Sequence, residues 1–258
     1  MATNRKVYLI DGSGYIFRAY YAVRPLSTKA GVPTNAVIGF ARMISKLLRQ
    51  EKPEFLGMVF DSPQKTFRHE IYDLYKANRD APPEDLIPQF QLIRDLTAAM
   101  DIPVLAAPGF EADDIIATLA QKATDSGFEV VVVSADKDLM QLVRQNVAMF
   151  DPMKSKLYGR EDVLEKFGVE PEMVADALAL AGDSSDNIPG VPKVGPKSAA
   201  KLIQEFGDVE KVIAGVATIE KPKAFQRSVI ENAESARLSK RLTVLSYEAP
   251  VELDEEGL

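Results

Sequence analysis

Three apolar runs rich in β-branched residues each end at an aspartate or just before one, and this pattern constrains the fold more than any other feature. The runs and the acids that follow them are residues 7–10 before Asp11, 56–60 before Asp61, and 130–133 before Asp136. Uniformly apolar runs of this length are typical of buried strands in a parallel sheet. Because ligands bind outside the carboxyl ends of such strands, we expect the three carboxylates to face one crevice.

Further acids occur close to these three and would give the crevice a high negative charge. They are Glu111, Asp113, Asp114, Asp138, Asp183 and Asp186. Two unit charges 4 Å apart repel by about 4 kcal/mol at an effective dielectric near 20, so such a crowded cleft requires cations. Lys137 can pair with one acid, but no basic run supplies a partner for all nine. The pattern therefore predicts a divalent-metal site.

Each acid taken alone also fits a simpler role. The acids at 111–114 and 136–138 can complement the dipole of a following helix, and those at 183–186 fit a helix cap and a turn. Asp11 and Asp61 are harder to explain in this way, because an acid that ends a buried strand needs a partner. We therefore favour a shared metal site over independent capping roles.

The acids divide into two groups, which suggests two ions. The first group is Asp11, Asp61, Glu111 and Asp113, and the second, partly through water, is Asp114, Asp136, Asp138, Asp183 and Asp186. Two ions about 4 Å apart suit in-line displacement at a phosphodiester. The chain has no cysteine and one histidine, His69, which we expect to be a surface or capping residue. Oxygen ligands favour Mg²⁺ or Mn²⁺.

The order of the elements predicts an α/β half followed by a helical half. Expected strands at 5–10, 55–60, 102–106, 128–134 and 146–150 alternate with expected helices at 15–22, 35–50, 84–100, 111–125 and 137–144. This alternation predicts a mostly parallel sheet with helices on both faces. Further helices are expected at 160–167, 171–181, 196–206, 208–214, 222–231 and 233–241. We expect domains at 1–158 and 159–258.

The charge of the chain is uneven. The net charge of −7 argues against a nucleic-acid partner when taken alone. Basic residues nevertheless cluster in two segments, at 65–79 and 193–201, and local potential directs a ligand more than the total charge does. No apolar run approaches the roughly 18 residues that span a bilayer, and the first residues lead straight into a strand, so we expect neither a membrane span nor a signal peptide.

Residues 188–204 predict a turn that leads into a helix. Gly190 and Gly195 flank the turn, and Pro196 suits the first turn of a helix, whose free amides form an anion seat. Lys197 and Lys201 lie four residues apart, on one helix face, within reach of phosphates. The alternative is a plain helical hairpin with glycines for geometry. A nucleotide-binding P-loop is rejected, because no strand precedes the segment.

The segment 65–79 combines basic and aromatic side chains. They are Lys65, Arg68, Lys76 and Arg79 with Phe67, Tyr72 and Tyr75. Such a mixture suits single-stranded nucleic acid, whose bases stack on aromatic rings. It suits a solvated helix with its aromatic residues in the core equally well.

A series of motifs resembles a known family. They are Leu9-Ile-Asp-Gly-Ser, Phe60-Asp-Ser, Phe67-Arg-His-Glu, Tyr75-Lys-Ala-Asn-Arg, Pro108-Gly-Phe-Glu-Ala-Asp-Asp, Ser134-Ala-Asp-Lys-Asp-Leu, Gly182-Asp-Ser-Ser-Asp-Asn-Ile-Pro-Gly and Val194-Gly. In this order, over nearly the whole chain, they resemble the 5′-nuclease domain that begins bacterial DNA polymerase I, within the flap-endonuclease superfamily. Polymerases of this family continue well beyond residue 258, so the chain is either an excised domain or a free-standing nuclease.

The resemblance implies a fold and a set of site residues. The fold would be PIN-like, with a helical arch at 64–82 and a helix–three-turn–helix element at 188–204. The nine acids would be the two-metal ligand set, with Arg18, Lys76 and Arg79 acting at the scissile phosphate. DNA contacts would come from Arg68, Tyr75, Gly190, Lys193, Gly195, Lys197, Ser198 and Lys201. Backbone carbonyls near Val191 and Val194 would bind K⁺.

The function implied is a structure-specific 5′ nuclease with 5′–3′ exonuclease and flap-endonuclease activity, for RNA primer removal and DNA repair. Its partners would be 5′ flaps, nicked or gapped duplex and RNA-primed ends, in the bacterial cytoplasm at the nucleoid. We expect a monomer, in some proteins joined to a polymerase. The alternatives are a non-catalytic junction-binding module and a related acid-cleft ribonuclease. A phosphatase with an aspartyl nucleophile is weaker, because it needs one acid.

Overall fold

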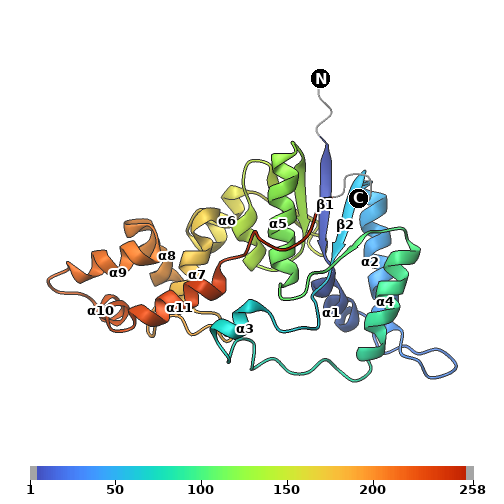
Figure 1. Ribbon diagram of the computed structural model, residues 1–258, viewed down its shortest axis with the longest axis horizontal. Helices are drawn as coiled ribbons and strands as arrows, with labels where there is room; N and C mark the ends of the chain where they lie inside the picture. Colours follow the sequence, from blue (N-terminus) through green and yellow to red (C-terminus); the bar gives the residue numbers. More distant parts are fainter. Residues whose placement is uncertain (1–4, 254–258) are drawn as a thin grey trace.

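One six-stranded sheet organises the first part of the chain. The computed structural model describes residues 5–253 (Figure 1). The strands are β1 (Lys6–Asp11), β2 (Phe55–Val59), β3 (Val104–Leu105), β4 (Glu129–Val133), β5 (Val147–Asp151) and β6 (Lys156–Tyr158). Their order is β3-β2-β1-β4-β5-β6, and only β6 is antiparallel to its neighbour. The predicted mostly parallel α/β sheet is confirmed.

Helices cover both faces of the sheet, which explains why the central strands are apolar throughout. One face holds α1 (Gly12–Ala22), α2 (Asn35–Glu51) and α4 (Ile87–Ala99), and the other holds α5 (Ala112–Asp125). Along β1 the side chains alternate between these layers: Tyr8 and Ile10 belong to the cluster with α2, and Val7 and Leu9 to the cluster with α5. Burial on both faces therefore requires a continuous apolar run.

A group of helices forms the other end of the molecule (Figure 1). It comprises α6 (Arg160–Phe167), the short 3₁₀ helix η2 (Pro171–Met173), α7 (Val174–Ala181), α8 (Pro196–Phe206), α9 (Val209–Ala217), α10 (Ala224–Glu231) and α11 (Ala233–Thr243). Their buried residues join the same hydrophobic cluster as the α5 face of the sheet. After α11 the chain returns along α5, where Thr118 Oγ1 accepts from the Ala249 amide at 3.1 Å.

Several elements differ from the sequence-based expectations. The strand expected at 102–106 is reduced to two residues, because Pro103 has no amide hydrogen to donate. The helix expected at 137–144 is a 3₁₀ helix, η1 (Asp138–Leu142), and β6 was not predicted because three residues carry no periodicity. Only α3 (Phe67–Ile71) is helical within 64–82. Within residues 5–253 no helix is both long and apolar enough to cross a membrane.

Candidate metal and nucleic-acid site

The three strand-ending acids do converge. Strands β2, β1 and β4 are neighbours in the sheet, so Asp61, Asp11 and Asp136 lie at adjacent carboxyl ends. A cavity of about 140 Å³ opens there, with Lys76 and Arg79 also in its lining. The acids that line it are Asp11, Asp61, Glu111, Asp113, Asp136, Asp138 and Asp186. Seven of the nine predicted acids therefore share one cavity, which below is called the acid cavity.

Asp11 is fixed by the turn from β1 into α1. It caps α1, and its Oδ1 accepts from the Gly14 amide at 2.8 Å. A Cβ at residue 14 would lie 2.3 Å from Asp11 Oδ2, so any residue larger than glycine there would displace this carboxylate. That second oxygen accepts from Ser134 Oγ at 2.9 Å, and the same hydroxyl accepts from the Asp136 amide. Ser134, which follows β4 directly, thus links two of the site acids.

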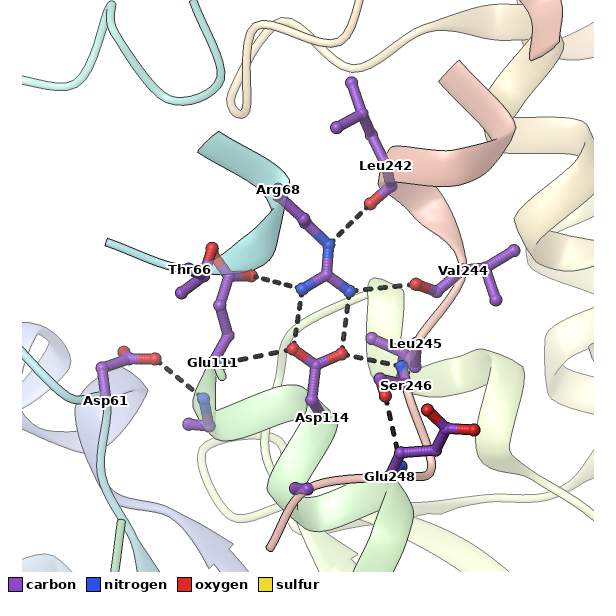
Figure 2. A network of polar contacts seen from close by, with 12 residues as sticks. Asp61, Thr66, Arg68, Glu111, Asp114, Leu242, Val244, Leu245, Ser246 and Glu248 are labelled. Carbon is purple, nitrogen blue, oxygen red and sulfur yellow. Dashed lines mark hydrogen bonds and ion pairs between the residues drawn. The ribbon is translucent and has the colours of Figure 1, made fainter. Parts of the chain in front are cut away.

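Asp61 is oriented by the start of α5. Its Oδ1 accepts from the Ala112 amide at 2.8 Å, as Figure 2 shows. This bond connects the end of β2 to the helix that carries Glu111, at its N-cap, and Asp113, in its first turn. The backbone of α5 therefore sets the spacing between Asp61 and the two acids of that helix.

The crowded carboxylates hold their protons more tightly than free ones. Burial, opposed by the bonds from Gly14 and Ser134, raises the pKa of Asp11 to about 6. Burial, and then the charge of Asp136, raise the pKa of Asp138 to about 7. Burial, and then the charges of Asp136 and Asp11, raise the pKa of Asp113 well above its usual value. Asp138 Oδ1 is buried without a hydrogen-bond partner within residues 5–253. These features fit a site that lacks positive charge.

Two basic side chains supply part of that charge. Lys76 Nζ lies 2.7 Å from Glu111 Oε1 and 3.5 Å from Asp186 Oδ2, and Arg79 pairs with Asp186. Burial acts against the charged lysine, but Glu111 and Asp186 outweigh it and raise the pKa of Lys76. In the described part of the chain, no three acidic or histidine side chains are placed to coordinate one ion.

The segment expected to form an arch, residues 64–82, packs against the loop that follows α7. The Lys76 amide donates to the Asp186 carbonyl at 2.9 Å, and Asn187 Nδ2 donates to the Leu74 carbonyl at 2.6 Å. His69 accepts from the Thr66 amide and caps α3, as expected. Within 64–82 the structure thus shows one short helix, α3, followed by turns, and Lys76 and Arg79 of this segment line the acid cavity.

Asp183 lies outside the lining of the acid cavity. Its Oδ2 pairs with Lys137 Nζ at 2.6 Å, and its Oδ1 accepts from the Ser185 amide at 2.8 Å. Burial would raise the pKa of Asp183, but the bonds from Lys137 and Ser185 outweigh it and lower that pKa. Asp183 therefore stays charged, and it holds Lys137 beside the site.

Asp114 contradicts the expectation that it binds metal. It is fully buried, and Arg68 donates to both of its oxygens, at 2.7 and 2.8 Å (Figure 2). The amides of Glu111 and Ser246 fill the remaining acceptor positions. A carboxylate has about four acceptor sites, so none is left for an ion. The role of Asp114 is to pair with Arg68.

Arg68 and Tyr75 are also wrong as DNA contacts, because the fold buries them. Arg68 is 1% exposed, and besides Asp114 it donates to the carbonyls of Leu242 and Val244 at 2.9 Å each (Figure 2). Tyr75 is 3% exposed, and its hydroxyl lies 3.1 Å from Glu111 and 3.2 Å from Asp186. Arg68 connects α3 to Asp114 and to the end of α11, and Tyr75 connects Glu111 to Asp186.

The hairpin at 188–204 places some of its predicted residues at the surface. Lys193, Lys197 and Lys201 are exposed, Gly195 caps α8, and Ser198 is half-buried. Gly190 is buried, and a Cβ there would lie 2.4 Å from the Gly182 amide nitrogen. The carbonyl of Gly190 accepts a hydrogen bond from Ser235 Oγ. Gly190 is therefore a close-packing residue and not a DNA contact. Val191 and Val194 have buried side chains.

Arg18 lies near Asp11, and it pairs with Asp151, a residue that the sequence analysis did not select. Arg18 Nη1 is 3.6 Å from Asp151 Oδ1, and Asp151 is a buried acid at the end of β5. The same rule that selected Asp11 would have selected Asp151, because it also ends an apolar strand. Its contact with Arg18 could not be predicted from sequence spacing.

Comparison with known families identifies the chain. The model for the N-terminal resolvase-like domain of 5′–3′ exonucleases matches residues 6–168, and the model for their C-terminal SAM fold matches residues 169–258. The chain belongs to the 5′–3′ exonuclease family. A DNA polymerase I of Rhizobium leguminosarum is 48% identical over 98% of this chain, and a 5′–3′ exonuclease of Aquifex aeolicus is 42% identical over 98% of it. The chain spans 26% of that polymerase and 86% of that exonuclease.

Solved structures support the same fold. T5 5′-exonuclease with divalent zinc ions bound superposes with a TM-score of 0.79, at 24% identity, over 93% of this chain and 89% of its own. The catalytic core of Rad2 in complex with DNA substrate superposes with a TM-score of 0.60, at 20% identity, over 98% of this chain and 81% of its own. At these identities the superpositions show a shared fold.

Proposed function

We propose that this chain is a structure-specific 5′ nuclease that acts as a 5′–3′ exonuclease and a flap endonuclease. The observation that carries the proposal is the acid cavity at the carboxyl ends of parallel strands, where seven carboxylates, three of them following strands, meet Lys76 and Arg79. Membership of the 5′–3′ exonuclease family supports this reaction. Removal of RNA primers and repair of DNA are the roles that fit it.

We propose two divalent ions, Mg²⁺ or Mn²⁺, in the acid cavity. The donors are carboxylate oxygens, which such ions prefer, and the unpartnered Asp138 Oδ1 is available. The ligands would be Asp11, Asp61, Glu111, Asp113, Asp136, Asp138 and Asp186, with Asp183 through water. Bound ions of this type activate water and stabilise the charge of a leaving oxygen. The zinc ions reported for T5 5′-exonuclease support metal binding in this fold.

Lys76 and Arg79 connect the acids to the substrate. Their charges now neutralise Glu111 and Asp186. We propose that the Lys76 and Arg79 side chains exchange these carboxylates for phosphates of the 5′ strand when ions occupy the cavity, and that segment 64–82 serves as the arch. The half-exposed Arg18, held by Asp151, approaches from the other side of Asp11.

The helical half would hold the duplex. We propose that Lys193, Lys197, Ser198 and Lys201 contact backbone phosphates beside Gly195, and that carbonyls near Val191 and Val194 bind K⁺. The division after residue 158 separates the catalytic sheet from this duplex-binding part. The Rhizobium and Aquifex relatives are bacterial, which supports a place in the bacterial cytoplasm at the nucleoid. Fusion to a polymerase domain, as in the Rhizobium relative, fits the same role.

Cleavage of a synthetic 5′-flap duplex with Mg²⁺ tests the proposal. Wild type should cut near the flap junction and release short 5′ fragments, whereas Asp136→Asn and a chelated sample should not. Equal wild-type and Asp136→Asn rates would reject metal-dependent cleavage. Tight flap binding without cutting would indicate a junction-binding module, and faster cutting of single-stranded RNA would indicate a ribonuclease.

Substitution of Lys76 should separate cutting from binding. Lys76→Ala removes a cation that lines the acid cavity, so we expect single-turnover flap cleavage to fall by about 100-fold. Affinity for an unflapped duplex should change less than threefold, because the hairpin lysines are untouched. A loss of duplex affinity as large as the loss of rate would contradict the assignment.

Substitution of Lys197 should have the reverse effect. Lys197→Ala removes an exposed charge from α8, so we expect weaker duplex binding and a slope of log Kd against log salt that is smaller by about 0.9. Lys211→Ala, at an exposed lysine of α9 paired with Asp208, is the matched control and should leave the slope unchanged. Equal slopes for Lys197→Ala and wild type would remove the hairpin from the interface.

The raised pKa values predict how pH and metal act together. Because the pKa of Asp11 rises to about 6 and that of Asp138 to about 7, the folded metal-free protein binds more protons than the unfolded chain. Their contribution to stability is present below about pH 4 and is lost as pH rises through 6 and 7. Ions compete with these protons. The rise in Tm on adding Mg²⁺ should therefore be larger at pH 8 than at pH 5.5, measured by calorimetry. An equal or larger rise in Tm at pH 5.5 would contradict competition between protons and ions in the acid cavity.

A further inference from the structure

A second cavity lies directly beside the acid cavity. It has a volume of about 490 Å³ and shares Asp11, Gly14 and Asp136 with its neighbour. Its remaining walls come from α1, the segment after β4, α6 and the loop at Ser185. This volume is typical of a small-ligand site and exceeds the needs of one ion. It is called the basic cavity below.

Three cationic side chains border the basic cavity. Arg18 forms an ion pair with Asp151 and Lys137 forms one with Asp183, whereas Lys166 forms no ion pair within residues 5–253. The Lys166 ammonium lies 5.5 Å from the Phe167 ring centroid. Burial, then the charges of Lys154 and Lys137, lower the pKa of Lys166. Asp11 and Asp136 also line the cavity, so among the described residues Lys166 is the cation that is free to attract an anion there.

The wall also contains an unpartnered buried hydroxyl. Tyr15 is 1% exposed, lines the basic cavity, and its hydroxyl has no hydrogen-bond partner in the described part of the chain. A buried hydroxyl without a partner is unfavourable, because it has lost its hydrogen bonds to water. This cost is removed if a bound group, or a water that it holds, accepts the hydrogen bond.

We propose that the basic cavity binds a backbone phosphate of the substrate strand, next to the scissile one, through Lys166, Arg18 and Lys137, with Tyr15 donating a hydrogen bond. This inference rests on the proposed nuclease function. Asp11 and Asp136 lie in the wall between the two cavities, with Lys76 and Arg79 in the acid cavity and Lys166 in the basic one. A strand crossing the acids would therefore meet cations on both sides.

Flap binding in chelator tests the basic cavity without any cleavage. Lys166→Ala should weaken binding by about fivefold and reduce the salt slope by about 0.7 to 0.9. Lys166→Arg should bind as wild type does. Lys6→Ala, at the opposite end of β1, removes the same charge and should change neither value. Lys166→Ala with wild-type affinity and slope would overturn the proposal.

Tyr15→Phe provides an independent measurement. It removes a hydroxyl that bonds to nothing in the protein, so the free energy of unfolding should not fall, while flap affinity should drop by about threefold. Unchanged flap affinity would remove Tyr15 from the site.

The phosphate could instead belong to the released 5′-mononucleotide, and inhibition of wild type and Lys166→Ala by a deoxynucleoside 5′-monophosphate distinguishes the two. Weaker inhibition of Lys166→Ala with unchanged flap binding would overturn the strand assignment. If wild type fails to cut flaps but Lys166→Ala still weakens binding, the nuclease function fails and the phosphate site stands.

Discussion

Asp11→Asn is expected to lower single-turnover flap cleavage by about 1000-fold and to leave flap binding within about threefold of wild type. Asp11 ends β1 in the lining of the acid cavity, where loss of its charge removes a proposed ion ligand. The variant should not be less stable, because burial of the ionised carboxylate is unfavourable, as its pKa of about 6 shows. Rapid-quench cleavage, chelated flap binding and urea denaturation measure the three quantities.

Asp125→Asn is the matched control for this substitution. Asp125 is an exposed acid at the end of α5, outside both cavities, and should cut at the wild-type rate. Cleavage by Asp11→Asn within about tenfold of the control would remove Asp11 from the metal site. A large loss of stability would show that the carboxylate has a structural role.

Arg68→Leu is expected to destabilise the fold by about 3–5 kcal/mol. The substitution leaves Asp114 buried and charged without its partner, which is among the most costly single changes in a protein interior. It also frees the carbonyls of Leu242 and Val244, through which Arg68 joins the end of α11 to α3 (Figure 2). Urea denaturation measures the loss.

Two further variants show whether the ion pair is the cause. Arg68→Leu with Asp114→Leu removes both charges and should recover part of the lost stability. Arg237→Leu breaks only exposed pairs, with Glu210 and Glu234, and should cost less than about 1 kcal/mol. If Arg68→Leu kept wild-type stability but lost DNA affinity, the expectation of a DNA contact at Arg68 would be restored.

The sequence was sufficient to predict the parts of the site that depend on local pattern. The apolar runs predicted β1, β2 and β4, and strand geometry then brought Asp11, Asp61 and Asp136 to one edge. The position of Asp113 followed from its place at the start of α5. Each of these inferences uses periodicity or the common direction of parallel strands, which neighbouring residues encode.

The pairing of side chains could not be predicted in the same way. Arg68 and Asp114 lie 46 positions apart, and only the packing of α3 against α5 and the end of α11 shows that they satisfy each other. In the sequence each had a more obvious role, as a DNA contact and as a metal ligand. Gly190 was misassigned for a similar reason, since its close contact with Gly182 depends on the folded loop.

Anomalous scattering from crystals soaked in Mn²⁺ is the most direct test of the central claim, that the acid cavity holds two ions. We expect two peaks about 4 Å apart among Asp11, Asp61, Asp113, Asp136 and Asp138, with Lys76 displaced from Glu111. No peak should lie at Asp114. Crystals that diffract with full Mn²⁺ present and show no peak in this cavity, or peaks only elsewhere on the surface, would contradict the claim.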